Sequence, residues 1–116
     1  MMSKSDRRLL IVEDDAAFAR TLVRSFERRS YQVRHLAGEE GMPALLQDFA
    51  PTHAVVDLKL AGGASGLSSV KHLHAFDAEM VIIVLTGYAI IATAVEAIKL
   101  GARHYLAKPS NTDDIE

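Results

Sequence analysis

Residues 9–15 read LLIVEDD, an apolar run that passes directly into three acidic residues. A short and nearly continuous apolar run is typical of a strand that is buried on both faces of a parallel sheet. Open α/β sheets bind their ligands outside the carboxyl ends of such strands. We therefore expect residues 8–12 to form a strand, with Glu13, Asp14 and Asp15 at a ligand-binding edge.

Three later apolar runs also end in residues that can take part in chemistry. Asp57, Thr86 and Lys108 each stand at the end of one of these runs. If the runs are parallel strands of one sheet, an acid, a hydroxyl and an amine join the first acids at the same edge. Each residue alone has a simpler reading, as a helix-terminal acid, a β-branched packing residue or a surface lysine. Their common order and placement favour a site.

Hydrophobic periodicity predicts alternating strands and helices joined by short connections. The expected strands are residues 8–12, 32–36, 53–57, 80–86 and 104–107, and the expected helices are residues 16–29, 38–48, 67–76 and 89–100, with a fifth helix only beginning after residue 110. This alternation predicts a doubly wound parallel sheet with helices on both faces.

Two of the helices carry specific expectations. Pro43 excludes a regular interior for helix 38–48, so this helix either starts late, with Pro43 in its first turn, or is kinked. In helix 89–100, the spacing of Ile91, Val95 and Ile98 predicts the stripe that faces the sheet. Ile90 lies outside that stripe and is expected on the surface.

Composition narrows the class of protein. The 116 residues suit one domain, and 49% hydrophobic against 24% charged residues is enough for a core. The absence of cysteine excludes disulfides and thiolate sites and suits the cytoplasm. No apolar stretch approaches the ~20 residues of a membrane span. The formal net charge of −2 argues against a basic nucleic-acid-binding face on this domain.

The acidic residues have the chemistry of a magnesium site. Glu13, Asp14 and Asp57 offer hard oxygen ligands, and Mg²⁺ is commonly bound by a few carboxylates together with a phosphate. A carboxylate can also act as a nucleophile and form an aspartyl phosphate. Thr86 can then donate a hydrogen bond to a phosphoryl oxygen, and Lys108 supplies a fixed positive charge.

With these residues in place, the chain resembles the receiver domain of two-component response regulators over essentially its whole length. Stretches 56–60 (VDLKL), 86–89 (TGYA), 92–102 (ATAVEAIKLGA) and 104–112 (HYLAKPSNT) resemble the RegA/PrrA/ActR group of redox-responsive transcription regulators. The resemblance implies a flavodoxin-like five-stranded sheet of order 2-1-3-4-5, with helix five truncated. It also implies one receiver domain over residues 1–116. The Fis-like helix-turn-helix domain that follows in that group has no counterpart in this sequence.

The resemblance also assigns roles at the metal site. It implies that Asp57 is the phosphoacceptor for a sensor histidine kinase. The metal ligands of Mg²⁺ would be Glu13, Asp14, Asp57 and the backbone carbonyl of Lys59. The glycine after the phosphoacceptor usually comes eight residues later, whereas Gly66 comes nine later, so the intervening loop holds one extra residue.

Further residues are implied to bind the phosphoryl group and to carry the switch. Thr86, Gly87 and Lys108 would bind the phosphoryl group, and Thr86 with Tyr105 would form the switch pair. A cis peptide bond is implied before Pro109. Phosphorylation would change the surface of the fourth helix and fifth strand, through which a phosphorylation-dependent homodimer is expected. The domain would then be a signalling module, not an enzyme, that catalyses only its own phosphotransfer and dephosphorylation.

Alternative functions remain open at this point. A stand-alone phosphorylatable adaptor shares every site residue. An Mg²⁺-dependent aspartyl phosphatase is disfavoured, because such enzymes typically carry a second acid two residues after the nucleophile, where Lys59 stands. His72 and His74 point to different helix faces, so exposed histidines are expected in place of a metal pair. The sequence around Ser65 lacks the final glycine of the nucleophile-elbow pattern, which argues against a serine hydrolase.

Overall fold

The computed structural model describes residues 7–58, 66–86 and 91–107. Its elements in chain order are β1 (Arg8–Val12), α1 (Ala16–Arg28), β2 (Gln32–Leu36), α2 (Met42–Phe49), β3 (His53–Asp57), α3 (Gly66–Phe76), β4 (Val81–Thr86), α4 (Ile91–Leu100) and β5 (His104–Ala107). All strand pairs are parallel, and the sheet order is β2-β1-β3-β4-β5. The expected fold class and strand order are confirmed. The expected start of a fifth helix lies outside the described residues.

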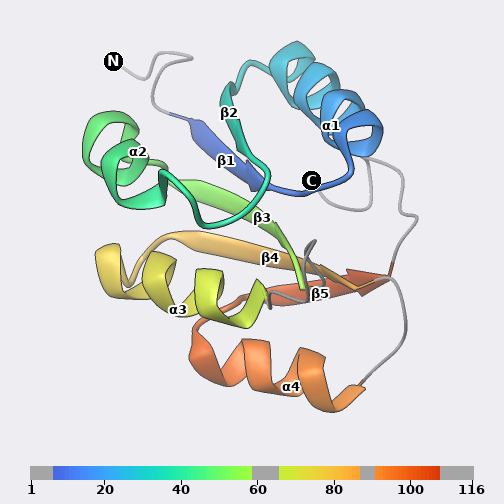
Figure 1. The fold of residues 1–116 in the computed structure, drawn as a ribbon, viewed down its shortest axis with the longest axis vertical. Coiled ribbons are helices and arrows are strands. Elements are labelled where there is room, and N and C mark those ends of the chain that lie inside the picture. Colours follow the sequence, from blue (N-terminus) through green and yellow to red (C-terminus); the bar gives the residue numbers. More distant parts are fainter. Residues whose placement is uncertain (1–6, 59–65, 87–90, 108–116) are drawn as a thin grey trace.

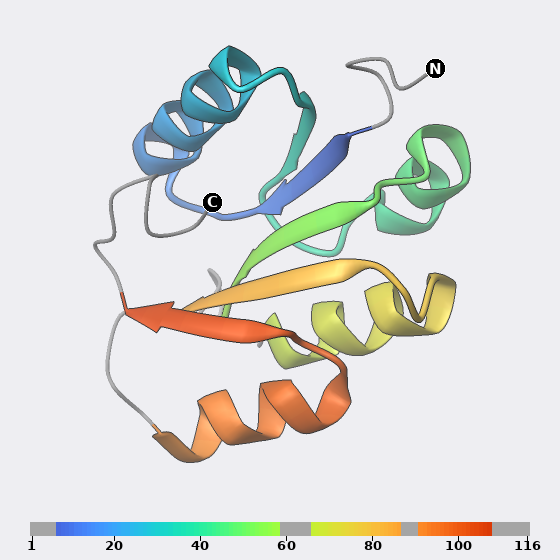
Figure 2. The ribbon, with the colours of Figure 1, turned by 180° about the vertical axis from the view of Figure 1, so that it is seen from behind.

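Two apolar clusters sandwich the sheet. One contains Leu10, Val12 and Val56 together with residues of α2, α3 and α4, such as Leu46 and Leu73. The other lies under α1 and is built from Leu9, Ile11, Leu22, Phe26, Val33, Val55 and Leu85. Neighbouring strand residues alternate between the clusters because successive side chains point to opposite faces. Figures 1 and 2 accordingly show α2, α3 and α4 on one face and α1 on the other.

Helices α1 and α2 begin where local chemistry allows. The Asp15 side chain accepts a hydrogen bond from the Phe18 N–H at 3.1 Å and caps α1. Gly41, with a φ of 80°, precedes α2, and Pro43 occupies its first turn. A proline is tolerated there because the first N–H groups of a helix have no partner within the helix. Of the two alternatives, the late start of this helix with Pro43 in its first turn is therefore confirmed, and the kink is not.

The expected buried stripe of α4 is wrong for two of its three residues. Val95 is 44% exposed and Ile98 is 39% exposed, whereas Ala97 is fully buried. Leu100 also packs against the core. This helix is apolar around much of its circumference, so spacing alone does not choose the buried side. The small Ala97 side chain allows the helix to lie close to the sheet, and the larger side chains are left outside.

The two histidines of α3 differ in their surroundings. The His72 side chain is 62% exposed, as expected. The expectation fails for His74, whose Nδ1 is buried without a partner among the described residues. The ring lies so close to Gly101 that a Cβ there would meet its Cγ at 2.5 Å. Because Gly101 ends α4 and lacks a side chain, it lets α3 and α4 approach each other.

Gly66 allows α3 to start directly against the backbone of β3. A Cβ at Gly66 would lie 2.2 Å from the Asp57 carbonyl oxygen and 2.8 Å from Leu58 Cα. The Gly66 N–H also donates to the Leu58 carbonyl at 2.9 Å. The extra residue of the preceding loop lies outside the described residues, but Gly66 packs tightly against the strand end that carries Asp57.

Replacing Gly66 with alanine should therefore destabilise the protein. The new methyl group meets main-chain atoms that cannot turn away, so overpacking is expected to lower the free energy of unfolding by about 1–3 kcal/mol. Gly38→Ala is the matched control, because a Cβ there has no neighbour within 4 Å. It should change stability by no more than about 0.5 kcal/mol. Urea unfolding of both variants measures the difference, and equal stabilities would contradict the close approach.

His53 gives the fold a predicted dependence on pH. Its ring packs edge-on against Tyr31 at 5.4 Å, at the start of β3. Burial of the ring, and secondarily the positive charge of Arg7, lowers the pKa of His53 below its usual 6.5. The unfolded chain then binds this proton more readily than the folded chain does. Stability should fall as the pH drops through 6.5 towards the folded pKa.

Urea unfolding between pH 7.5 and 5.5 tests this prediction against His53→Phe, which keeps a ring beside Tyr31 but cannot be protonated. The wild type should lose more free energy of unfolding over this range than the variant does. The other histidines are common to both proteins and cancel in the comparison. An identical loss in both proteins would show that His53 does not contribute.

Candidate functional site

The strand register brings the predicted site residues to one edge of the sheet. Val12 pairs with Val56, so Glu13 and Asp57 follow at neighbouring positions on β1 and β3. Asp57 pairs with Leu85 on β4, and Thr86 comes next. In Figure 1 the carboxyl ends of β3, β4 and β5 point to the same side of the molecule.

Three carboxylates meet at this edge. Glu13, Asp14 and Asp57 each offer an oxygen atom, and these atoms lie within 4.8 Å of one another. Glu13 is 1% exposed and Asp57 is 3% exposed, whereas Asp14 is exposed. Two oxygens bound to one Mg²⁺ at about 2.1 Å can lie at most about 4.2 Å apart, and for Ca²⁺ the limit is about 5 Å. A small adjustment would therefore let the cluster hold either divalent cation.

The turn between β1 and α1 is anchored at Glu13. Its N–H donates to the Leu36 carbonyl at 2.9 Å, and its side-chain Oε2 accepts from the Asp15 N–H at 3.0 Å. Its carbonyl lies 2.7 Å from Nε2 of His35. Sequence reasoning missed His35, because nothing within the weak strand 32–36 signals a contact with a residue 22 positions earlier.

Asp57 is held by the backbone on both sides. It is the last residue of β3, and the following N–H, that of Leu58, donates to the Leu85 carbonyl at 2.9 Å. Gly66 packs against its carbonyl from α3. A carboxylate fixed at a strand end, beside two further acids, has the placement required of a nucleophile that works next to a bound cation.

The remaining predicted residues are only partly covered by the described chain. Thr86 lies at the end of β4 and pairs with Ala107 of β5. Tyr105 lies in β5 with 46% of its surface exposed. The others, Lys59, Gly87, Ile90, Lys108 and Pro109, lie outside the described residues. Their assigned roles, and the cis bond before Pro109, stay predictions.

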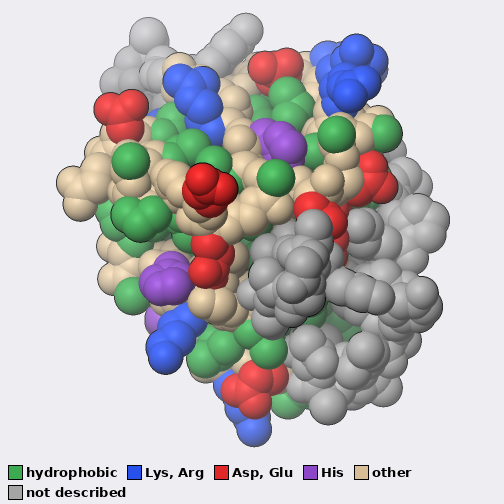
Figure 3. All heavy atoms as spheres, in the orientation of Figure 1, with side chains coloured by type: hydrophobic (Ala, Val, Ile, Leu, Met, Phe, Trp, Pro, Cys, Tyr) green, Lys and Arg blue, Asp and Glu red, His purple; other side chains and the backbone are tan. Residues whose placement is uncertain are grey.

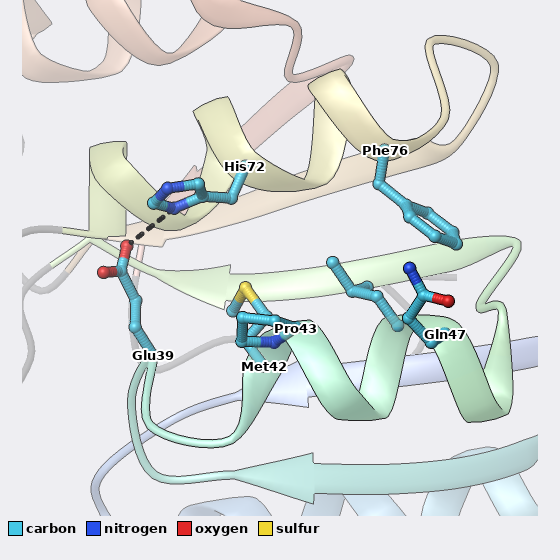
Figure 4. Close-up of a pocket in the computed structure, with 7 residues that line it drawn as sticks. Glu39, Met42, Pro43, Gln47, His72 and Phe76 are labelled. Carbon is cyan, nitrogen blue, oxygen red and sulfur yellow. Dashed lines mark ion pairs between the residues drawn. The ribbon is translucent and has the colours of Figure 1, made fainter.

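A separate groove of about 320 Å³ lies between α2 and α3. Met42, Pro43 and Phe76 supply apolar lining, and Glu39 and His72 form an ion pair at 3.4 Å at one end (Figure 4). On this face the described Lys and Arg side chains lie apart, near the margins (Figure 3). The groove shares no lining residue with the acidic cluster.

Within the part of the chain that the structure describes, no helix has the length and apolar character needed to cross a membrane.

Comparison with known proteins identifies the family of the chain. The family model of the response regulator receiver domain matches residues 9–116. The chain is 46% identical to the photosynthetic apparatus regulatory protein RegA of Rhodobacter capsulatus over 96% of this chain and 60% of RegA. It is also 46% identical to the acid tolerance regulatory protein ActR of Rhizobium meliloti, over 95% of this chain and 56% of ActR. The chain thus spans less than two thirds of these relatives.

Solved structures show the same fold. A response regulator from Burkholderia pseudomallei, with a phosphorylated aspartic acid, calcium and citrate, has a TM-score of 0.88 and 44% identity over 95% of this chain and 64% of that one. A CheY-like receiver domain from Methanospirillum hungatei has a TM-score of 0.86 and 29% identity, over 94% of this chain and 86% of that one. The chain belongs to the response regulator receiver domain family of two-component systems and is close to the RegA and ActR transcription regulators.

Proposed function

We propose that this receiver takes a phosphoryl group from a sensor histidine kinase onto Asp57, with Mg²⁺ held by Glu13, Asp14, Asp57 and the Lys59 carbonyl. The meeting of three carboxylates, one of which belongs to the buried strand-end aspartate, carries the proposal. Three like charges so close together repel one another and favour a bound cation. The similar Burkholderia structure contains a phosphorylated aspartic acid and a calcium ion, which supports the same chemistry here.

In the proposed transfer, a carboxylate oxygen of Asp57 attacks the phosphorus of the kinase phosphohistidine. The new phosphorus–oxygen bond forms as the phosphorus–nitrogen bond breaks, and the imidazole leaves with the electron pair. Mg²⁺ when bound would offset the negative charge that the phosphoryl oxygens bring to the three acids. The backbone contacts of Asp57 and the anchored turn at Glu13 keep the carboxylates in place during the transfer.

Phosphorylation is proposed to shift a conformational equilibrium. Thr86 and Gly87 would bind the phosphoryl oxygens, and Lys108 would pair with their charge. Movement of Thr86 toward the phosphoryl group would open space for Tyr105. The exposed position of Tyr105 in this structure is the one expected before that change.

The relatives point to transcriptional control as the output. RegA and ActR are regulatory proteins, and this chain covers 60% and 56% of their lengths. We infer that the receiver acts in the cytoplasm and controls a DNA-binding output domain. A stand-alone adaptor is the second candidate. Lys59, standing where aspartyl phosphatases carry their second acid, favours a stoichiometric switch over repeated turnover.

The labelling experiment is incubation with acetyl phosphate and Mg²⁺, followed by mass spectrometry of the intact protein. The wild type should gain one phosphoryl group, and Asp57→Asn or excess chelator should abolish the gain. Asp48→Asn is the matched control, since this α2 aspartate lies outside the carboxylate cluster. Undiminished labelling of Asp57→Asn would refute the assignment, and rapid release of phosphate without accumulation of the phosphorylated protein would indicate a phosphatase.

We further propose that the α4–β5 surface is the contact that phosphorylation changes, through a homodimer. Val95 and Ile98 on α4 and Tyr105 on β5 are all exposed, although the side chains are large and mostly apolar. The burial of a whole valine or isoleucine contributes roughly 1.5–3 kcal/mol. Because these two are about two-fifths exposed, covering both would contribute on the order of 1–2 kcal/mol.

Sedimentation with and without beryllofluoride, a phosphoryl mimic, tests this surface. The double variant Val95→Ser/Ile98→Ser should dimerise about tenfold more weakly than the wild type in beryllofluoride. Phe76→Ser is the matched control, because Phe76 is 41% exposed but lies on α3. Equal association of all three proteins, in both conditions, would exclude α4–β5 as a phosphorylation-sensitive contact.

A further inference from the structure

We propose that His35 is a positioning residue for the metal site, and that its ring holds the turn from which Glu13 and Asp14 reach the cation. His35 Nε2 lies 2.7 Å from the Glu13 carbonyl oxygen. A carbonyl oxygen only accepts hydrogen bonds, so Nε2 must carry the proton and donate it. The inference rests on the proposed function, since it concerns affinity for the cation that assists phosphorylation.

The contact acts on the peptide unit between the two acids. That unit is planar, so the direction of the Glu13 carbonyl sets the direction of the Asp14 N–H and the place of the Asp14 Cα. The N–H of Glu13 is already bound to the Leu36 carbonyl at 2.9 Å. The adjacent β2 residues His35 and Leu36 thus bind the carbonyl and the N–H of Glu13, respectively. Asp14 therefore extends from a fixed backbone.

The acids need such an anchor because they repel one another. Their oxygens lie within 4.8 Å, and Asp14 is the exposed member of the cluster. Without an anchor, the exposed turn could relieve the repulsion by moving Asp14 away, and a cation would have to draw it back. The His35 hydrogen bond opposes that movement before the cation arrives, which should raise affinity for the ion.

Core packing does not explain why a histidine stands at position 35. The burial pattern of β2 leaves Gln32, Arg34 and His35 exposed, and Val33 is its only buried residue. A side chain on such an edge strand can be replaced without opening a cavity in the core. Its hydrogen bond to the acidic turn, 22 residues away in the chain, is therefore its distinctive contact.

The test compares His35→Gln with His35→Met. Glutamine keeps an N–H donor at similar reach, whereas methionine has nearly the same length and no donor. Mg²⁺ binding is followed by NMR titration, because the chain contains no tryptophan to report it by fluorescence. His35→Met should bind Mg²⁺ about three- to tenfold more weakly than the wild type, the scale of one hydrogen bond. His35→Gln should bind within about twofold of the wild type.

Two controls separate positioning from general damage. Gln32→Met changes an exposed residue at the opposite end of β2 and should leave Mg²⁺ affinity unchanged. Phosphorylation of His35→Met by acetyl phosphate should be slow at low Mg²⁺ and should recover at saturating Mg²⁺. A purely structural defect would persist at saturation.

The possible outcomes separate failure of this inference from failure of the proposed function. Equal Mg²⁺ affinity in wild type, His35→Gln and His35→Met overturns the inference, and so does equal weakening in both variants, since the donor would then be irrelevant. If His35→Met does not fold, the inference is tested by NMR of the wild type. A slowly exchanging His35 Hε2 that is coupled to the Glu13 carbonyl supports the inference, and the absence of this signal overturns it. If the wild type binds Mg²⁺ and substitution of His35 has no effect on that binding, the proposed function still stands. A wild type that binds no Mg²⁺ overturns both.

Discussion

The parallel pairing of β1 with both β2 and β3 is the constraint on which the site depends. Val12 is paired with Leu36 on one side and with Val56 on the other. The next residue of β1, Glu13, therefore meets β2 through its main chain and approaches Asp57 through its side chain. A shift of one residue in either pairing would turn every side chain of β1 to the opposite face. The same ladders that bury the apolar strands thus also align the acids.

This alignment works against stability for the sake of the site. Glu13 and Asp57 are almost fully buried, and a buried charge is unfavourable unless polar partners compensate it. Part of that compensation is visible at Glu13, where the Asp15 N–H binds the side chain. A cation would add more. The edge of the sheet is accordingly suited to switching, because its electrostatic balance depends on what is bound there.

A second constraint concerns the face of α4 that points away from the protein core. The small Ala97 side chain brings this helix close to the sheet, and the larger apolar side chains of Val95 and Ile98 remain exposed. Exposed apolar side chains are common on soluble proteins, but Val95 and Ile98 on α4 together with Tyr105 on β5 fit the proposal that this surface is covered in one state of a switch. The relatives RegA and ActR are longer than this chain, which spans 60% and 56% of their lengths.

Local sequence patterns were enough to predict the fold class, the strand positions and the identity of the clustered acids. Residues 9–12 and 80–85 are apolar throughout, and this pattern is compatible with few structures other than buried parallel strands. Pro43 and the acids that follow β1 also had local consequences that could be read directly. In each case a local pattern, such as an apolar run that ends in an acid, carries the signal.

By contrast, packing between the elements determines which face of α4 is buried, where Gly66 packs and what His35 contacts. An apolar helix offers several sides, and the shape of the sheet beneath it selects the one that carries Ala97. The Gly66 contact depends on how α3 meets the end of β3, and the His35 hydrogen bond depends on the register of β1 with β2. These contacts join residues far apart in sequence, and neither residue carries a local signal of its partner.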